Sequence, residues 1–231
     1  MDSLCALLAL LLLFCSAGAS DSPWKAVRVG DAVTFPVVAP KGQRLTNILL
    51  RDSSRQQAVA IWMDSKEITV VDIKYAGRVT FQMDEMAFRI ANLSLDDGGK
   101  YETSTGFTSS SPVVLGSFLV AVFNVTQRIS PLKNDSCLIY LDCEAGMGPG
   151  HRVTYAWKDT KAGTTLSREA WLTQLLHPDQ QRDYACVAQS SAGQSTFSFV
   201  LQHPCVPSAA SPGPWALGSL LVMAALLLLL L

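Results

Sequence analysis

The order of four residues in the second half of the chain constrains the fold more than any other feature. Cys143 is followed by Trp157 and then by Tyr184-x-Cys186. This order is the signature of an immunoglobulin core, in which two cysteines bridge two β-sheets over a buried tryptophan. The interval from Cys143 to Cys186 is short and leaves little room for C′ and C″ strands. The sequence therefore predicts a constant-type immunoglobulin domain at about residues 127–206.

Two further cysteines, Cys137 and Cys205, bracket this domain. An even number of cysteines beyond the N-terminal apolar run argues for disulfides rather than free thiols. Cys137 and Cys143 would lie about 20 Å apart along one strand, so they cannot bond to each other. The immunoglobulin order pairs Cys143 with Cys186, and we expect Cys137 to pair with Cys205. No C-x-x-C pair occurs and the histidines lack ligand spacing, so no metal or cofactor is expected.

A second pattern is typical of the corner between strands E and F of an immunoglobulin domain. It reads Phe88-x-Ile90-x-x-Leu93-x-x-x-Asp97-x-Gly99-x-Tyr101. Its apolar members should point into the core, and Gly99 should allow the turn. We expect the Tyr101 hydroxyl to bond back to the corner and Asp97 to pair with Arg78.

Short stretches of alternating polarity surround this corner and predict a β-sandwich. They are residues 30–37, 48–50, 58–63, 67–72 and 78–82. The stretch 58–77 has room for C′ and C″ strands, which indicates a variable-type domain at about 20–126. Val37 and Thr103 occupy the positions of the usual disulfide, and strand C lacks its tryptophan. The predicted fold is all-β: two tandem immunoglobulin-like sandwiches, variable-type without a disulfide and then constant-type with two.

The N-terminus has the pattern of a cleaved signal peptide. An apolar run from Leu4 to Phe14 precedes Ala17 and Ala19, which form an A-x-A-like site. Residues 1–19 are therefore expected to be removed. An uncleaved membrane anchor is the alternative, but the run is shorter than the ~20 residues that a span needs.

The C-terminus has the pattern of a glycosylphosphatidylinositol signal at residues 207–231. Small residues precede Pro-Gly-Pro and an apolar run from Trp215 to Leu231. The attachment residue is predicted among Ser208, Ala209, Ala210 and Ser211, and Ser208 is the position we assign. A spanning helix is the alternative, but the run reaches only about 25 Å. The expected location is the outer leaflet of the plasma membrane.

Three Asn-x-Ser/Thr triplets, at Asn92, Asn124 and Asn134, are candidate glycosylation sites in an extracellular chain. The formal net charge of −1 implies no nucleic-acid partner. The Gly146-x-Gly148-x-Gly150 stretch does not match a phosphate-binding loop, and we interpret it as a mobile B–C loop.

Together these features resemble the signalling lymphocyte activation molecule family of lymphocyte adhesion receptors. The resemblance covers both domains, and it rests on a variable-type domain without its disulfide before a constant-type domain with two. The matching segments are Cys137-Leu-Ile-Tyr-Leu-Asp-Cys143, Thr154-Tyr-Ala-Trp157, Tyr184-x-Cys186 and the closing Cys205. The chain is most similar to the family's lipid-anchored type of member. That similarity implies a ligand for same-family receptors on natural killer cells and T cells.

The resemblance implies binding through the C-C′-C″-F-G sheet of the first domain to a same-family receptor on another cell. The charged and polar residues expected on that sheet are Arg51, Arg55, Asp64, Lys66, Glu67, Glu102 and Ser104. Strand F should turn Tyr101 and Thr103 inward, so Glu102 and Ser104 face outward. A mixed-charge face suits weak, specific adhesion. A weak homophilic contact is a second candidate interaction.

Two other functions are alternatives to an adhesion or co-stimulatory ligand. An inhibitory decoy for the same receptor would use the same face. An ectoenzyme is disfavoured, because no nucleophile elbow, H-E-x-x-H or Ser/His/Asp arrangement occurs and Asp96-Asp97 has a structural explanation at the E–F corner. No catalytic residue is expected.

Overall fold

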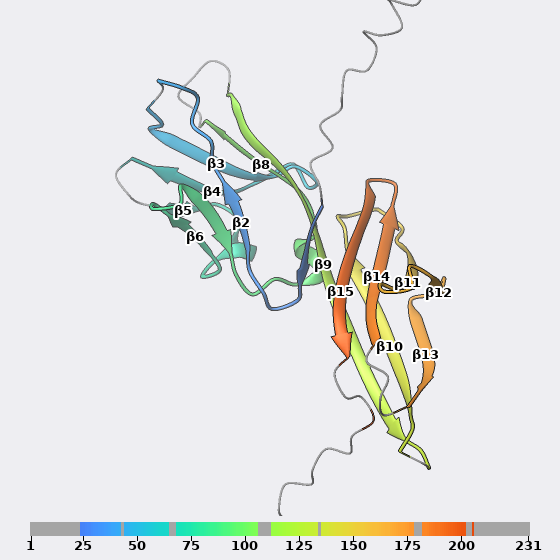
Figure 1. Ribbon diagram of the computed structural model, residues 1–231. Helices are drawn as coiled ribbons and strands as arrows, with labels where there is room; N and C mark the ends of the chain where they lie inside the picture. Colours follow the sequence, from blue (N-terminus) through green and yellow to red (C-terminus); the bar gives the residue numbers. More distant parts are fainter. Residues whose placement is uncertain are drawn as a thin grey trace, which may run out of the picture.

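The computed structural model describes residues 24–42, 44–64, 68–105, 112–133, 135–177, 182–201 and 205. Several predictions fall outside these residues: the signal peptide at 1–19, Lys66, Glu67, Asn134, and the attachment site and tail that include Ser208. Two β-sandwiches follow one another along the chain (Figure 1). No helix within the described part has the length and hydropathy to cross a bilayer.

The first sandwich consists of a large sheet and a small one. The large sheet has the order β1 (Trp24–Arg28), β9 (Val114–Pro131), β8 (Gly99–Thr105), β3 (Asn47–Asp52), β4 (Gln57–Met63) and β5 (Ile68–Val70). The small sheet has the order β2 (Val33–Pro36), β7 (Ala87–Ile90) and β6 (Val79–Gln82). β1 runs parallel to β9, whereas the other pairs are antiparallel. Strands β4 and β5 are the C′ and C″ strands, which confirms the variable-type fold.

Val37 and Thr103 occupy the positions of the usual disulfide in the core of this sandwich. Val37 is 7% exposed and Thr103 is fully buried. The tryptophan missing from strand C is replaced by Trp62 from β4, which is 3% exposed and stacks on Phe81 with ring centroids 4.8 Å apart. The Thr103 hydroxyl has no hydrogen-bond partner among the described residues. Packing of large side chains therefore compensates for the absent disulfide.

The E–F corner has the predicted structure. The turn η2 (Leu95–Asp97) joins β7 to β8, and Asp97 is fully buried. Both carboxylate oxygens of Asp97 accept bonds from Arg78, at 2.9 and 3.0 Å. Lys74, which lies in the turn η1 (Ile73–Tyr75), forms an ion pair of 2.9 Å with the same carboxylate. These bonds compensate for the desolvation of the buried charge.

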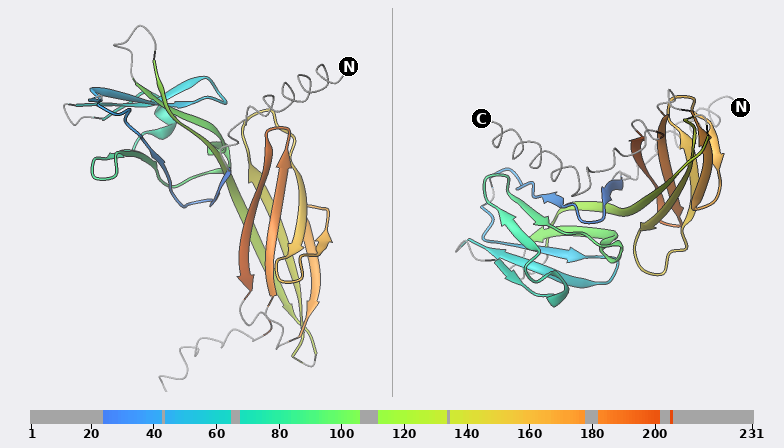
Figure 2. Two further views of the ribbon diagram at one scale, coloured as in Figure 1. Left: turned by 45° about the horizontal axis from the view of Figure 1, so that its top comes forward. Right: turned by 90° about the horizontal axis from the view of Figure 1, so that it is seen from below.

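The second sandwich has a three-stranded and a four-stranded sheet. The C-terminal half of β9 pairs with β10 (Cys137–Gly146), which pairs with β13 (Trp171–Leu176). The other sheet has the order β12 (Thr165–Ser167), β11 (Thr154–Asp159), β14 (Arg182–Ser190) and β15 (Gly193–Leu201). Figure 2 shows this sandwich from two further sides.

Both predicted disulfides are present in the second sandwich. Cys143 on β10 bonds to Cys186 on β14, with Cα atoms 6.5 Å apart, beside the fully buried Trp157. Cys137 bonds to Cys205, with Cα atoms 5.1 Å apart. The first bridge joins the two sheets, and the second fastens the chain after β15 to the start of β10. The constant-type prediction is confirmed.

A single strand, β9, belongs to both sandwiches. Val120 and Val122 lie in the first core, whereas Ala121 and Phe123 lie in the second. Successive side chains of a strand point to opposite sides, so one short segment supplies two cores. The boundary proposed between residues 126 and 127 falls inside this strand. No loop separates the two sandwiches.

Glycines allow two backbone segments to meet where the sandwiches join. A Cβ atom on Gly98 would collide with the carbonyl of Gly146, and a Cβ on Gly146 would collide with the carbonyl of Leu95. The stretch predicted as the B–C loop thus starts from a glycine packed against the E–F turn of the first sandwich. Met147, which follows it, is 2% exposed.

Candidate functional site

The outer side of the large sheet of the first sandwich is the candidate binding face. We call it the outer face; it comprises the outward side chains of β9, β8, β3, β4 and β5. Ile48, Leu50 and Asp52 of β3 are at most 1% exposed and point inward. The alternation of a strand therefore turns the intervening residues outward. The outer face comprises Asn47, Leu49, Arg51, Ile61, Met63, Thr69, Lys100, Glu102, Ser104, Ser117 and Leu119.

Charged residues gather at one end of the outer face. Arg51 of β3 lies directly opposite Glu102 of β8. Glu102 forms an ion pair of 2.8 Å with Lys100. The hydrogen bond with Lys100 is the main cause that lowers the pKa of Glu102, against the opposing effect of partial burial, and the Arg51 charge acts in the same direction. The carboxylate is therefore ionised at neutral pH.

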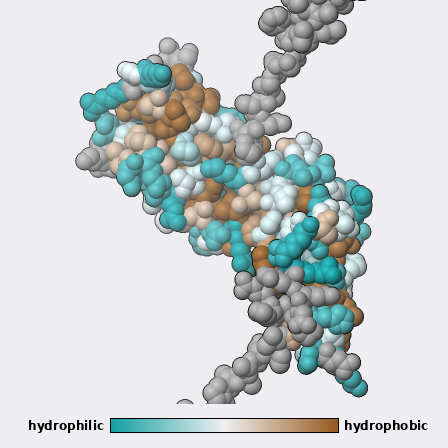
Figure 3. Space-filling view, viewed as in Figure 1, coloured by the Kyte–Doolittle hydropathy of each residue, from teal (hydrophilic) through white to brown (hydrophobic). Residues whose placement is uncertain are grey.

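The centre of the outer face is apolar. Leu49 lies opposite Ser104 on one neighbouring strand and Ile61 on the other. Leu49 is 8% exposed, and Met63 is 41% exposed. An apolar centre with charges at its border is the composition of protein interfaces. Figure 3 shows one side of the molecule, where hydrophobic and hydrophilic residues are mixed on the surface of the first sandwich.

The structure brings some of the predicted face residues together and not others. Arg51, Glu102 and Ser104 point outward from neighbouring strands, and Tyr101 and Thr103 point inward as expected. Asp64 follows the end of β4 and forms an exposed ion pair of 2.6 Å with Arg44. Asp64 therefore borders the outer face at the end away from Arg51.

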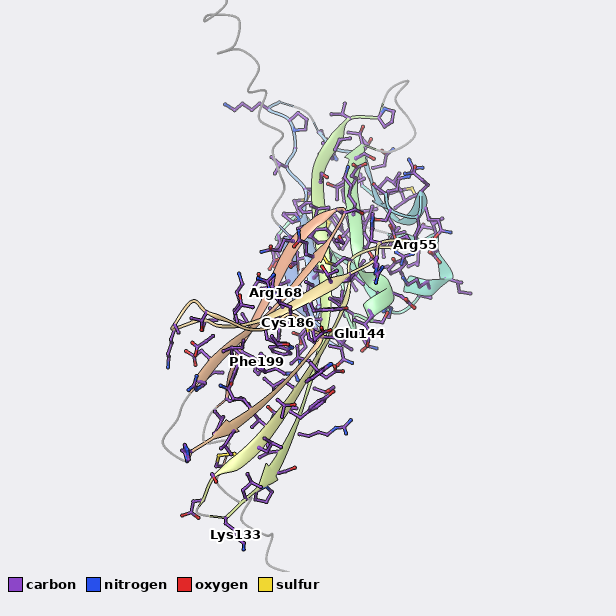
Figure 4. All side chains as sticks on the ribbon, turned by 90° about the vertical axis from the view of Figure 1, so that its right-hand side faces the viewer. Arg55, Lys133, Glu144, Arg168, Cys186 and Phe199 are labelled. Atoms are coloured by element: carbon purple, nitrogen blue, oxygen red, sulfur yellow. A yellow bond between two sulfur atoms is a disulfide. The ribbon has the colours of Figure 1, made fainter. Side chains whose placement is uncertain are left out.

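Arg55 is a correction to the predicted face. Its guanidinium bonds to the carboxylate of Asp52 at 2.7 Å and to the main-chain carbonyl of Asp96 at 2.6 Å. Asp52 is 1% exposed and points inward. Arg55 lies in the turn after β3 (Figure 4), so its side chain closes the end of the sandwich instead of joining the outer face.

The sequence patterns do not predict the apolar centre or Lys100 as part of the outer face. Leu49 reads as part of a buried run with Ile48 and Leu50, and only the strand register separates the outward residue from its inward neighbours. Thr103 is predicted to face inward, and it lies opposite Leu50. Once this pairing is known, Leu49, which lies opposite Ser104, must face outward.

The two candidate glycosylation sites within the described residues lie away from the outer face. Asn92 is exposed after β7 and has a φ of 51°, a conformation that asparagine tolerates. Asn124 is half-buried on β9, beyond the part that pairs with β8. Sugars at either position would leave the outer face open. No cluster of three potential metal ligands occurs among the described residues.

Comparison with known proteins supports the resemblance to signalling lymphocyte activation molecules. SLAM family member 5 of Mus musculus is 24% identical over 184 residues, which are 77% of this chain and 54% of that protein. T-lymphocyte surface antigen Ly-9 of Homo sapiens is 24% identical over 195 residues, which are 80% of this chain and 29% of that protein. The chain thus spans about half or less of the relatives it matches. No family model matches the chain.

Solved structures similar to this chain include those of CD58 and CD84. The CD2-binding domain of CD58 (lymphocyte function-associated antigen 3) is 20% identical, with 79% of this chain and 99% of that one covered and a TM-score of 0.39. CD84 is 17% identical, with 44% of this chain and 97% of that one covered and a TM-score of 0.37. The curated relatives confirm the resemblance to the SLAM family inferred from the sequence.

Proposed function

We propose that this chain, which resembles the SLAM family, is a cell-surface adhesion or co-stimulatory ligand. Its partner is an immunoglobulin receptor of the same family on another immune cell, and it binds through the outer face. The observation that carries the proposal is the apolar centre formed by Leu49, Ile61 and Met63 beside the charged group of Arg51, Lys100 and Glu102.

The size of the outer face suits a transient contact. Five strands at about 4.8 Å spacing and seven residues at about 3.3 Å rise cover roughly 550 Å². Two such surfaces together bury about 1,100 Å², at the lower end of specific interfaces. The apolar centre would supply most of the binding free energy, while the charges would direct encounter and reject wrong partners.

We further propose that the mature chain is held on the outer leaflet by a lipid at Ser208 or a neighbouring small residue. The glycosylphosphatidylinositol signal at 207–231 supports this anchor. Treatment of expressing cells with phosphatidylinositol-specific phospholipase C should release the protein. Retention on the cell, with the apolar tail still detected by mass spectrometry, would favour a spanning helix.

One binding experiment tests the function. A soluble multimer of residues 20–206 should stain cells that express individual SLAM-family receptors, and Leu49→Arg should abolish the staining. Arg89→Glu is the matched control, because Arg89 is exposed on β7 in the opposite sheet of the same sandwich. Equal staining by the Leu49→Arg variant and the wild type would refute the proposed face.

A decoy and a ligand would use the same face and differ only in the response of the cell that bears the receptor. A ligand should trigger that cell when presented on a membrane, whereas a decoy should occupy the receptor and suppress triggering by another ligand. Homophilic contact is separable too, because it requires staining of cells that express this chain alone.

A further inference from the structure

The second sandwich carries an aromatic and apolar surface on the sheet formed by β9, β10 and β13. Its outward side chains include Leu138, Trp171 and Leu175, which are 39%, 49% and 51% exposed. Leu138 lies directly opposite Leu175, and Asp142 lies opposite Trp171. The half-buried Tyr140 lies between them and contacts Arg128, whose guanidinium is 5.7 Å from its ring centre. We call Leu138, Tyr140, Trp171 and Leu175 the lower apolar surface.

The side of the sheet on which these residues lie follows from their neighbours. Ile139 and Leu141 of β10 are fully buried and Cys143 is 2% exposed, so they face the core. The residues between them, including Tyr140 and Asp142, therefore face outward. Exposed apolar groups clustered on one sheet face favour association unless something covers them.

Asn124 lies on the same side of the same sheet. It pairs with Glu144, which is exposed, while the next residue, Val125, packs against the core. Figure 4 shows Glu144 near the junction of the sandwiches and Lys133 at the far tip of the β9–β10 hairpin. The outer side of this sheet thus extends from the Asn124 position down to that tip.

The register places Asn124 close to Trp171. Asn124 on β9 lies opposite Glu144 of β10, and Trp171 on β13 lies opposite Asp142 of β10. The two residues are therefore two strands apart and offset by two residues along the strands. At about 4.8 Å per strand and about 3.3 Å per residue, the separation is roughly 12 Å. The first sugars of an N-linked glycan can cover that distance.

We propose that the N-linked glycan on Asn124 lies over the lower apolar surface and packs on Trp171. The C–H faces of pyranose rings contact aromatic rings well, and Asp142 and Arg128 offer hydrogen-bonding groups for sugar hydroxyls. The covalent attachment gives the glycan a high effective concentration at this surface. The same glycan would exclude a flat protein partner, so we assign the surface to the glycan and not to an interface.

This inference rests on the proposed cell-surface location, because N-linked glycans are added in the secretory pathway, but not on receptor binding. Its first test is mass spectrometry of the full chain from mammalian cells. Sugar is expected on Asn124. Sugar on Asn92 but not on Asn124 would overturn the inference alone, whereas sugar on neither would overturn the proposed location together with it.

The second test measures coupling between the sugar and the tryptophan. Trp171→Ala should lower Tm more in the glycosylated protein than in the Asn124→Gln background, because only the former loses a sugar–aromatic contact. Native digestion with an amidase specific for N-glycans should release the Asn124 glycan about two- to tenfold faster from Trp171→Ala, the factor expected for one aromatic contact.

The matched control combines Trp171→Ala with Asn92→Gln, which removes the sugar from the other sandwich. The two changes should be additive in Tm, and release of the Asn92 glycan should be unaffected by Trp171→Ala. An equal Tm loss in the wild-type and Asn124→Gln backgrounds, with unchanged release at Asn124, would overturn the packing.

Discussion

The hydroxyl of Tyr101 donates a hydrogen bond of 2.7 Å to the main-chain carbonyl of Asp97, four residues earlier in the chain. The same hydroxyl lies 3.0 Å from the hydroxyl of Tyr75, and Tyr101 is 1% exposed. Strand β8 and the turns η1 and η2 are thus joined at one buried point. The Tyr75 hydroxyl, which donates its proton to Tyr101, also lies 3.5 Å from the Asp52 carboxylate, so the network extends to β3.

Tyr101→Phe should destabilise the first sandwich. The change removes both bonds of the hydroxyl and leaves the Asp97 carbonyl and the Tyr75 hydroxyl each short of one bond. The expected loss is about 1–3 kcal/mol in the free energy of unfolding. Urea denaturation of the full chain should show an earlier unfolding of the first sandwich. Tyr140→Phe, on the surface of the second, is the control and should leave that transition unchanged.

The buried tyrosines also predict sensitivity to alkaline pH. Burial raises the pKa of Tyr75 and of Tyr184 from the ordinary value of 10.0 to about 12, and it raises the pKa of Tyr101 as well. A raised folded-state pKa gives stability that is complete below the unfolded value and lost as pH rises through the folded value. Unfolding free energy should therefore fall between pH 10 and pH 12.

Tyr75→Phe isolates one part of this effect. The variant should lose stability at neutral pH, because the hydroxyl bonds are gone, but its first sandwich should show a smaller further loss between pH 10 and pH 12. Parallel pH curves for the variant and the wild type would show that Tyr75 does not titrate on unfolding.

Thr103→Val should be neutral or stabilise the chain by up to about 1–2 kcal/mol. The Thr103 hydroxyl is buried without a hydrogen-bond partner among the described residues, and valine has the same shape without the polar group. Thermal unfolding of the first sandwich measures the change. A clear loss of stability would mean that the hydroxyl is satisfied, for example by a buried water.

Gly146→Ala should loosen the joint between the sandwiches. The added methyl would collide with the carbonyl of Leu95, so the E–F turn must move away. Small-angle scattering should report a broader range of domain orientations, with a stability loss of about 1–3 kcal/mol. Gly163→Asn is the control, since a side chain there meets open space and asparagine tolerates its φ of 66°. Unchanged scattering for Gly146→Ala would contradict the role of the glycine contact.

If the outer face binds as proposed, Glu102→Lys should slow association with the receptor. The substitution places three positive charges together, because Arg51 and Lys100 lie beside position 102. Surface plasmon resonance should show an association rate about three- to tenfold lower at low salt, with the difference shrinking as salt rises. Lys66→Glu, outside the described residues, is the companion change expected to weaken binding. If neither charge reversal changes the association rate, the outer face is not the binding face.

Local motifs predicted much of this fold. Two motifs are recognisable in the sequence from a few residue types at fixed spacings: the order Cys143, Trp157 and Cys186, and the corner from Phe88 to Tyr101. The bond of Asp97 with Arg78 followed from the same corner. Short segments determine such features, so the features can be predicted without knowing how distant segments pack.

Features that depend on distant packing escaped prediction. Arg55 resembles any surface arginine after a strand, and only its approach to Asp52 and to the carbonyl of Asp96 decides its direction. Gly146 resembles a flexible loop residue, and only the neighbouring Leu95 shows why no side chain fits. These contacts join segments that are remote in sequence, so no local pattern encodes them.

The continuity of β9 has a mechanical consequence. A force applied to the outer face would be transmitted through the first sandwich to β9 and along β9 to the second sandwich. β9 is hydrogen-bonded to β8 in the first sandwich and to β10 in the second. Both ladders run along the direction of pull, so their hydrogen bonds would share the load in shear instead of opening one by one. Pulled in this direction, the two sandwiches would therefore behave as one stiff rod, and the chain would resist extension until both ladders fail together.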